Sequence, residues 1–269
     1  MKKLIYFALF AITVSFVLSS CSKDHVNPPS ISKTYVIVHG AFQGPSAWLK
    51  VKAGLETQGQ KVILIQLAGH EKDQTDPSKI TMDVYRDQVV EAINGVSGKV
   101  ILVGHSLGGM VISAVAEKIP AKIKRLVYVA AYIPASGQSL IDLAKTDPGS
   151  LLSPALSMPT PYTLDVQHDK ITNIFIQDGT DAEKNQLLTD YKVEPGQPFG
   201  QPVTLTSANY GTVDKYYIHT LQDHAISPDL QNRMVAAAGI KSVYQLNTSH
   251  SPFISKPDSV TTLLIRIAK

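Results

Sequence analysis

The sequence feature that most constrains the fold is a serine flanked by glycines directly after an apolar run. Residues 100–104 read Val-Ile-Leu-Val-Gly, and His-Ser106-Leu-Gly108 follows. The run is typical of a strand buried on both faces, and the apolar residues after Gly109 suit a helix. Gly-x-Ser-x-Gly in this setting predicts a sharp strand-to-helix turn that presents the serine at the carboxyl end of a sheet. A glycine-rich turn with a capping serine is the alternative.

The rest of the chain alternates between short apolar runs and helical patterns. Its 269 residues suit one large α/β domain or two small ones. Helical periodicity is visible at 82–93, from 257 onward and at about 181–191, and this alternation favours a parallel sheet covered by helices. Strands are predicted at 35–38, 62–65, 100–103, 126–130, 216–218 and 243–246.

Residues 132–212 interrupt this rhythm with a long stretch that lacks a strong buried strand. It contains eight prolines together with scattered aromatic and aliphatic residues. An ordered insertion of this length is usually functional, so it is interpreted as a cap over the sheet. A disordered surface loop is the alternative.

The N-terminal residues have the pattern of an export signal. Lys2 and Lys3 precede an apolar stretch at 4–18, which is shorter than the ~20 residues of a membrane-spanning helix. Leu-Ser-Ser-Cys21 resembles the lipobox of bacterial lipoproteins, which implies a signal peptide at 1–20, lipidation of Cys21 and a polar tether at 21–33 before a domain at 34–269. The residue after the cysteine is Ser22, which implies the outer membrane, periplasmic or surface-facing. An ordinary signal peptide or an uncleaved anchor is the alternative.

Composition excludes several classes of function. The formal net charge is +3 and no Lys/Arg cluster stands out, which argues against nucleic-acid binding. The single cysteine excludes an intramolecular disulfide and a Cys-rich zinc site. Neither a His-Glu-x-x-His motif nor a phosphate-binding loop ending in Lys-Ser/Thr is present, so no metal is expected.

A nucleophilic serine needs a base, and the base needs an acid that orients it. His250 follows the last predicted strand and precedes the C-terminal helix, where a base would reach over the strand ends. The acid is expected after the penultimate predicted strand, where Asp223 lies. A solvent-exposed loop histidine and a loop-capping aspartate are the respective alternatives, and weaker candidates for the acid are Asp178, Asp214 and Asp229.

An oxyanion hole needs two backbone N–H donors. One is expected from Leu107, directly after the serine. The other is expected from Ala41, in the loop that follows the first predicted strand, where Gly40 gives the backbone freedom to turn. A plain strand-end turn is the alternative for this loop.

These motifs resemble the α/β-hydrolase superfamily over residues 34–269. More narrowly, Val-His-Gly-Ala-Phe-Gln-Gly-Pro-Ser-Ala-Trp48, Gly-His-Ser-Leu-Gly-Gly-Met and His250-Ser-Pro-Phe resemble plant methyl esterases, hydroxynitrile lyases and related bacterial esterases. The resemblance implies a mostly parallel sheet flanked by helices, with a cap at about 132–212 inserted before the last two core strands. It also implies a Ser–His–Asp triad, no cofactor and a mostly apolar pocket.

Two differences from the hydroxynitrile lyases distinguish between the activities found in this group. Hydroxynitrile lyases carry threonine where this chain has Gly40, and lysine where it has Ser251, so hydrolysis is favoured over cyanide elimination. Ser106 also excludes a haloalkane dehalogenase, which needs an aspartate nucleophile. A third departure, Ser249 in place of a frequent aspartate, is not expected to affect the chemistry.

The resulting hypothesis is a serine carboxylesterase that acts on small to medium esters through an acyl-enzyme on Ser106. Gly40, Phe42 and Phe253 are expected to line the substrate pocket, as is Leu107, with ordinary core packing as the alternative. A receptor-like protein that keeps the triad but turns over slowly or not at all is the second hypothesis. A third, a lipoprotein that serves as an adhesion or scaffold surface, is disfavoured by the intact triad.

Overall fold

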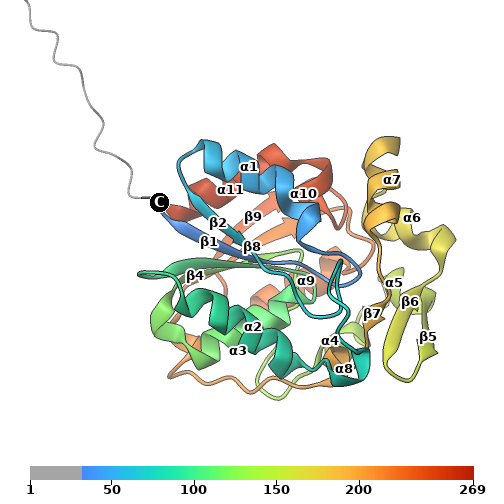
Figure 1. Ribbon diagram of the computed structural model, residues 1–269, viewed down its shortest axis with the longest axis horizontal. Coiled ribbons are helices and arrows are strands. Elements are labelled where there is room, and N and C mark those ends of the chain that lie inside the picture. The colour runs from blue at the N-terminus through green and yellow to red at the C-terminus, as the bar shows by residue number, and fades with distance from the viewer. Residues whose placement is uncertain (1–31) are drawn as a thin grey trace, which may run out of the picture. The chain divides into compact units, whose positions relative to one another are not determined.

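A six-stranded sheet in the order β2-β1-β3-β4-β8-β9, with every neighbouring pair parallel, forms the centre of the fold (Figure 1). The computed structural model describes residues 32–269. The predicted parallel sheet is confirmed, and each predicted strand is present with its ends shifted by up to three residues. The strands are β1 (Thr34–Val38), β2 (Lys61–Leu64), β3 (Val100–His105), β4 (Ile123–Val129), β8 (Lys215–Thr220) and β9 (Ser242–Leu246).

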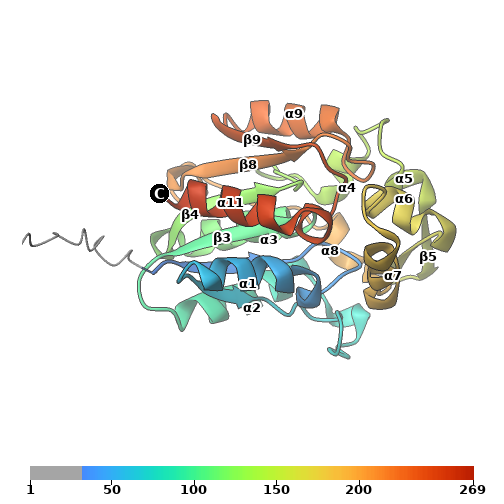
Figure 2. The same cartoon turned by 90° about the horizontal axis from the view of Figure 1, so that it is seen from above.

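Helices cover both faces of this sheet, which explains why its inner strands are continuous apolar runs (Figures 1 and 2). One face carries α1 (Leu49–Thr57), α10 (Pro252–Ser255) and α11 (Pro257–Ala268). The other carries α2 (Met82–Asn94), α3 (Gly108–Lys118) and α9 (Pro228–Ala237). The connections within residues 32–269 also contain short 3₁₀ helices: η1 (Pro45–Trp48), η2 (Pro77–Lys79), η3 (Pro120–Lys122), η4 (His168–Lys170) and η5 (Tyr210–Thr212).

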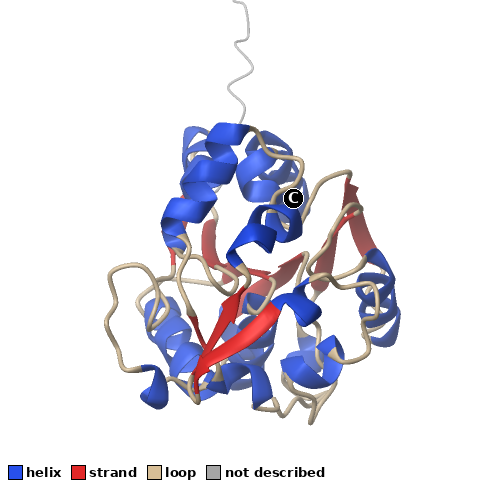
Figure 3. Cartoon of the chain, turned by 90° about the vertical axis from the view of Figure 1, so that its right-hand side faces the viewer, coloured by secondary structure: helices blue, strands red, loops and turns tan. Residues whose placement is uncertain are grey.

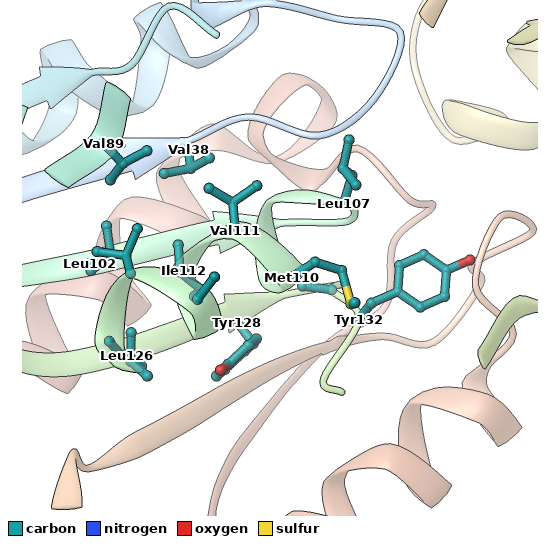
Figure 4. Packing of buried hydrophobic residues seen from close by; sticks show 14 of the residues in the cluster. Val38, Val89, Leu102, Leu107, Met110, Val111, Ile112, Leu126, Tyr128 and Tyr132 are labelled. Atoms are coloured by element: carbon teal, nitrogen blue, oxygen red, sulfur yellow. The ribbon is translucent and has the colours of Figure 1, made fainter. Parts of the chain in front are cut away.

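The helix α3 is the most deeply buried of these helices, since nine of its residues are buried. Figure 4 shows Met110, Val111 and Ile112 of this helix packed among side chains of β1, β3 and β4. Because α3 follows Ser106 directly, this packing fixes the position of the turn that carries the serine.

The cap, residues 132–212, connects β4 to β8. Residues 151–196 lie beyond the carboxyl ends of the strands, and the chain then returns along α3, where the Thr206 and Tyr210 N–H groups donate to Glu117 (Figures 1 and 3). The position of the cap before the last two core strands is as predicted. A three-stranded antiparallel sheet within it was not predicted. The cap contains α4 (Leu140–Ala144), α5 (Leu152–Ala155), β5 (Leu156–Thr160), β6 (Thr163–Val166), α6 (Ile171–Phe175), α7 (Asp181–Asp190), β7 (Glu194–Pro195) and α8 (Gln197–Gly200).

The predicted signal peptide, Cys21 and the tether up to residue 31 lie outside the described residues. Within residues 32–269, no helix is both long and apolar enough to span a membrane.

Candidate active site

Ser106 occupies the turn between β3 and α3 with its backbone in the left-handed region, at φ 52°. Non-glycine residues rarely adopt this conformation, and where they do it often serves a functional site. Close packing enforces it here. A Cβ on Gly108 would lie 2.7 Å from the carbonyl oxygen of Val38 and 2.8 Å from that of His39, so only glycine lets α3 begin this close to the end of β1.

The loop after β1 passes directly beside the serine. A Cβ on Gly40 would lie 2.8 Å from the Cβ of Ser106 and 2.6 Å from Nδ1 of His105. Ala41 and Leu107, which were predicted to donate the two oxyanion N–H groups, both line the same cavity as Ser106. Glycine is therefore needed at position 40 for the loop after β1 to lie this close to Ser106. A threonine, which the lyases carry at this position, would have no room here.

Gly40→Ala is expected to lower kcat/KM for a small ester by about 10²-fold, because the added methyl must push the loop that carries Ala41 away from Ser106. Overpacking should also lower the free energy of unfolding by about 1–3 kcal/mol. Steady-state kinetics and thermal unfolding of the variant measure both effects. Gly95→Ala is the matched control, since the nearest atom to its added Cβ lies 3.7 Å away. Equal kinetics in the two variants would contradict the close approach at Gly40.

His250 and Asp223 form a buried hydrogen-bonded pair. His250 Nδ1 lies 2.8 Å from Asp223 Oδ2, and the two residues are 1% and 3% exposed. They come from the loops that follow β9 and β8, as the sequence predicted. Among the described residues, His250 Nε2 is buried without a hydrogen-bond partner. The imidazole is thus oriented by Asp223 through Nδ1, while Nε2 has no partner among the described residues.

The carboxylate of Asp223 is held by four further donors. Oδ1 accepts the backbone N–H groups of Ala225 at 2.8 Å and Ile226 at 2.9 Å. Oδ2 accepts the Thr220 hydroxyl at 2.7 Å and the Gln231 amide at 3.1 Å. These hydrogen bonds fix the orientation of the carboxyl group. They also fix which oxygen faces the imidazole.

Two of the rival carboxylates have other partners. Asp178 lies in the cap and accepts the hydroxyl of Ser249, next to His250, and that of Ser255 at 3.0 Å. Asp229 pairs with Arg233 on α9 at 2.8 Å. Ser249, where relatives often carry aspartate, therefore ties the loop of His250 to the cap.

A cavity of about 330 Å³ opens over Ser106. The cap supplies most of its walls, and those residues could not be singled out from sequence because they come from short cap elements without strong periodicity. Two charged residues, Lys145 and Asp147, are among those that line it. The other lining residues are Ala41, Phe42, Ser106, Leu107, Tyr132, Leu140, Ile141, Ala144, Pro148, Leu152, Ser153, Leu156, Leu164, Phe175 and Phe199.

Of the residues expected to form the pocket, Phe42 and Leu107 line this cavity, whereas Gly40 and Phe253 do not. Phe253 is fully buried and stacks on Trp48, with ring centroids 4.2 Å apart. It also packs edge-on against His105 at 4.7 Å. The alternative of core packing therefore describes Phe253, which packs against the residue that precedes Ser106.

Buried histidines give this protein a defined stability response to pH. Burial lowers the pKa of His39, His105 and His219, whereas His70, despite its burial, has its pKa raised by Glu194. The unfolded chain therefore binds more protons than the folded protein once pH falls below the ordinary value of 6.5.

We expect the free energy of unfolding to fall by about 1 kcal/mol between pH 7.5 and 6.0, since the stabilisation from three neutral histidines is complete above their ordinary pKa and is lost on acidification. His70 opposes this trend but is only one group. Urea unfolding at both pH values measures the change. The exposed His168, replaced by asparagine, is the control and should leave the change intact. Stability that rises on acidification would contradict the assignment of neutral histidines.

Within residues 32–269, no cluster of three or more His, Cys, Asp or Glu side chains has the arrangement of a metal site.

Comparisons with known proteins agree with this architecture. The chain is 29% identical over 255 residues to the Arabidopsis thaliana protein named "Putative methylesterase 14, chloroplastic", covering 89% of this chain and 73% of that protein. It is 28% identical over 253 residues to methylesterase 9 of the same plant, covering 88% and 98% of the two chains. The crystal structure of polyneuridine aldehyde esterase shares the fold with a TM-score of 0.80 at 22% identity, covering 88% of this chain and all of that one.

The family profile described as "Alpha/beta hydrolase family" matches residues 35–262, which is most of the chain. The profile spans the turn that carries Ser106, the cap and the loops that carry Asp223 and His250. The chain therefore belongs to the alpha/beta hydrolase family.

Proposed function

We propose that this protein is a serine carboxylesterase that hydrolyses small to medium esters. The observation that carries the proposal is Ser106, held at positive φ beside an apolar cavity, in the same molecule as a buried His250–Asp223 pair whose Nε2 has no partner among the described residues. Relatives named as methylesterases support ester hydrolysis as the reaction.

In the proposed mechanism, His250 Nε2 takes the hydroxyl proton of Ser106 while the serine oxygen attacks the ester carbonyl. The carbonyl oxygen gains negative charge, which the N–H groups of Ala41 and Leu107 stabilise. His250 then donates the proton to the leaving alcohol, and an acyl-enzyme remains on Ser106. Water, deprotonated by His250, attacks this ester and releases the acid. Asp223 keeps the Nδ1 proton in place and stabilises the imidazolium that forms in each half.

The cavity supports a substrate of limited size. Its volume of about 330 Å³ lies at the lower end of small-molecule sites, and its walls are mainly aliphatic and aromatic. An apolar acyl group together with a small alcohol, such as the methanol of a methyl ester, suits these dimensions. No cofactor enters the proposed reaction.

The test is a series of p-nitrophenyl esters from acetate to long acyl chains, with the domain at 32–269 assayed beside Ser106→Ala. We expect serine-dependent turnover with the highest kcat/KM at short chains. A maximum at long chains would contradict the size limit but leave the esterase reaction in place. Absence of serine-dependent turnover with every ester would contradict the proposed function and favour the receptor-like alternative.

We also propose that the protein is an exported bacterial lipoprotein anchored to the outer membrane through Cys21, which lies outside the described residues. The support is the charged start, the apolar stretch and the Leu-Ser-Ser-Cys21 pattern. Full-length protein should sediment with membranes, and Cys21→Ala should lose this association. Membrane association that is unchanged in Cys21→Ala would contradict the lipid anchor.

A further inference from the structure

Phe42 follows the predicted oxyanion donor Ala41 and has a left-handed backbone, at φ 63°. A bulky residue keeps this conformation only where its surroundings enforce it. The conformation of Phe42 sets the direction of the chain next to Ala41, so whatever holds Phe42 also holds the oxyanion donor.

A short segment of the cap, residues 191–194, contacts Phe42 in three ways. The Lys192 N–H donates to the Phe42 carbonyl oxygen at 3.0 Å. The Phe42 N–H donates to Oε2 of Glu194 at 2.6 Å. The Tyr191 ring stacks on the Phe42 ring, with centroids 5.6 Å apart and planes 4° from parallel. Both backbone groups and the side chain of Phe42 are therefore fixed by residues 191–194 of the cap.

Glu194 is fully buried, and a carboxylate in that position needs a partner. Its Oε2 lies 2.9 Å from Nε2 of His70, which is also fully buried. The other ring nitrogen of His70 faces the Ala68 carbonyl oxygen at 3.0 Å. Both nitrogens thus face acceptors, so the ring is suited to carry both protons. Burial opposes this charge, but Glu194 raises the pKa of His70 in spite of it.

We propose that Glu194 is a positioning residue for the oxyanion hole: its carboxylate, held by His70, fixes the Phe42 backbone and thereby the N–H of Ala41. Glu194 reaches the oxyanion loop from β7 in the cap, 152 residues along the chain from Phe42. The hole is then complete only while the cap is seated on the core. This inference rests on the proposed esterase function.

The test compares Glu194→Leu with Glu194→Gln in the hydrolysis of p-nitrophenyl acetate. Leucine removes the acceptor for the Phe42 N–H, so kcat should fall by about 10²-fold with KM nearly unchanged. Glutamine can place its amide oxygen where Oε2 stands, so that it accepts from both Phe42 and His70, while its NH₂ faces the Tyr85 hydroxyl, which lies 3.5 Å from Oε1 of Glu194. It should therefore restore most of the lost kcat.

A second readout is inhibition by a trifluoromethyl ketone, whose adduct with the serine carries its negative charge in the oxyanion hole. The inhibition constant in Glu194→Leu should rise by about the same factor as kcat/KM falls, since both report stabilisation of the oxyanion. Loss of cap packing without displacement of Ala41 would lower Tm and leave this constant unchanged.

Glu183→Gln is the matched control. Glu183 is also a cap carboxylate with a partner on the core, Lys50 at 3.4 Å, and it caps α7 through Thr180. Glutamine keeps the capping role and removes only the ion pair. Its kinetics and its inhibition constant should match those of the wild type.

If Glu194→Leu does not fold, Lys192→Pro tests whether the cap positions the Phe42 backbone. It removes the N–H that donates to the Phe42 carbonyl and leaves the buried pair intact. Tyr191 already has the extended backbone (ψ 137°) that precedes a proline. A parallel fall in kcat and in trifluoromethyl ketone affinity is expected.

The outcomes separate the two proposals. If wild type shows serine-dependent hydrolysis but the folded Glu194→Leu, or Lys192→Pro in its place, keeps wild-type kcat and inhibition, the positioning role of Glu194 is wrong and the esterase function stands. If wild type shows no serine-dependent hydrolysis, both proposals are overturned.

Discussion

Ser106→Ala is expected to lower kcat for p-nitrophenyl acetate by about 10⁴- to 10⁶-fold. The methyl side chain cannot form the acyl-enzyme, and what remains is binding beside the oxyanion donors. Stopped and continuous p-nitrophenol assays measure the loss.

The fold should not change in this variant. Alanine and serine pay a similar cost at φ 52°, and the Ser106 side chain makes no hydrogen bond to another described residue that would be lost. Tm and the far-UV circular dichroism spectrum should therefore match those of the wild type. Retention of a substantial part of the activity in the folded variant would show that another group is the nucleophile.

Asp223→Asn is expected to lower kcat by about 10⁴-fold through the wrong tautomer of His250. Oδ1 accepts two backbone N–H groups, from Ala225 and Ile226, so the amide oxygen of asparagine must take this place. The amide NH₂ then faces Nδ1 of His250 and donates to it. The imidazole proton moves to Nε2, which can no longer accept a proton from Ser106.

Because the loss comes from the tautomer, it should have a distinct signature. The dependence of kcat on pH should change in the variant, while KM should stay close to that of the wild type. Asp229→Asn, on the exposed surface of α9, is the control and should keep wild-type kinetics. Activity of Asp223→Asn within about 10-fold of wild type would contradict the role of Asp223 as the orienting acid.

The central sheet could be predicted from sequence because strands that are buried on both faces consist of continuous apolar runs, which are visible in the sequence itself. The run at 100–105 is buried at every position and is apolar over its first four residues. The turn at Ser106 is equally local, since three glycines permit close approaches that no other residue allows there. His250 and Asp223 followed from the order of strands, because parallel strands end at one edge of the sheet.

The cap could not be predicted in the same way. Four of the five residues of β5 are exposed, so this strand has no apolar alternation. Pro159 lies within the strand and Pro161 in the turn that follows it. Helix α7, by contrast, was predicted at about 181–191, where a capping box from Thr180 to Glu183 marks its start. The walls of the cavity depend on how these elements pack against one another, and hydrophobic periodicity in the sequence does not predict that packing.

Glu194 is the clearest case of a residue whose role could not be predicted from the sequence. It lies in a short, proline-containing stretch, and nothing in its neighbourhood distinguishes it from a solvated glutamate. Its burial results from contacts with Phe42 and His70, which are distant in sequence. Phe253 illustrates the opposite error. An aromatic residue close to the base suggests a pocket wall, but the stacking on Trp48 turns it toward the core.

The most direct test of the central claim is mass spectrometry of the protein quenched in acid during turnover of p-nitrophenyl acetate. The account predicts an acetyl group on the peptide that contains Ser106, together with a burst of p-nitrophenol that approaches one equivalent per enzyme if deacylation is slow. His250→Gln should abolish both. A burst of p-nitrophenol without an acetyl group on Ser106, or an acetyl group found on another residue, would contradict the account.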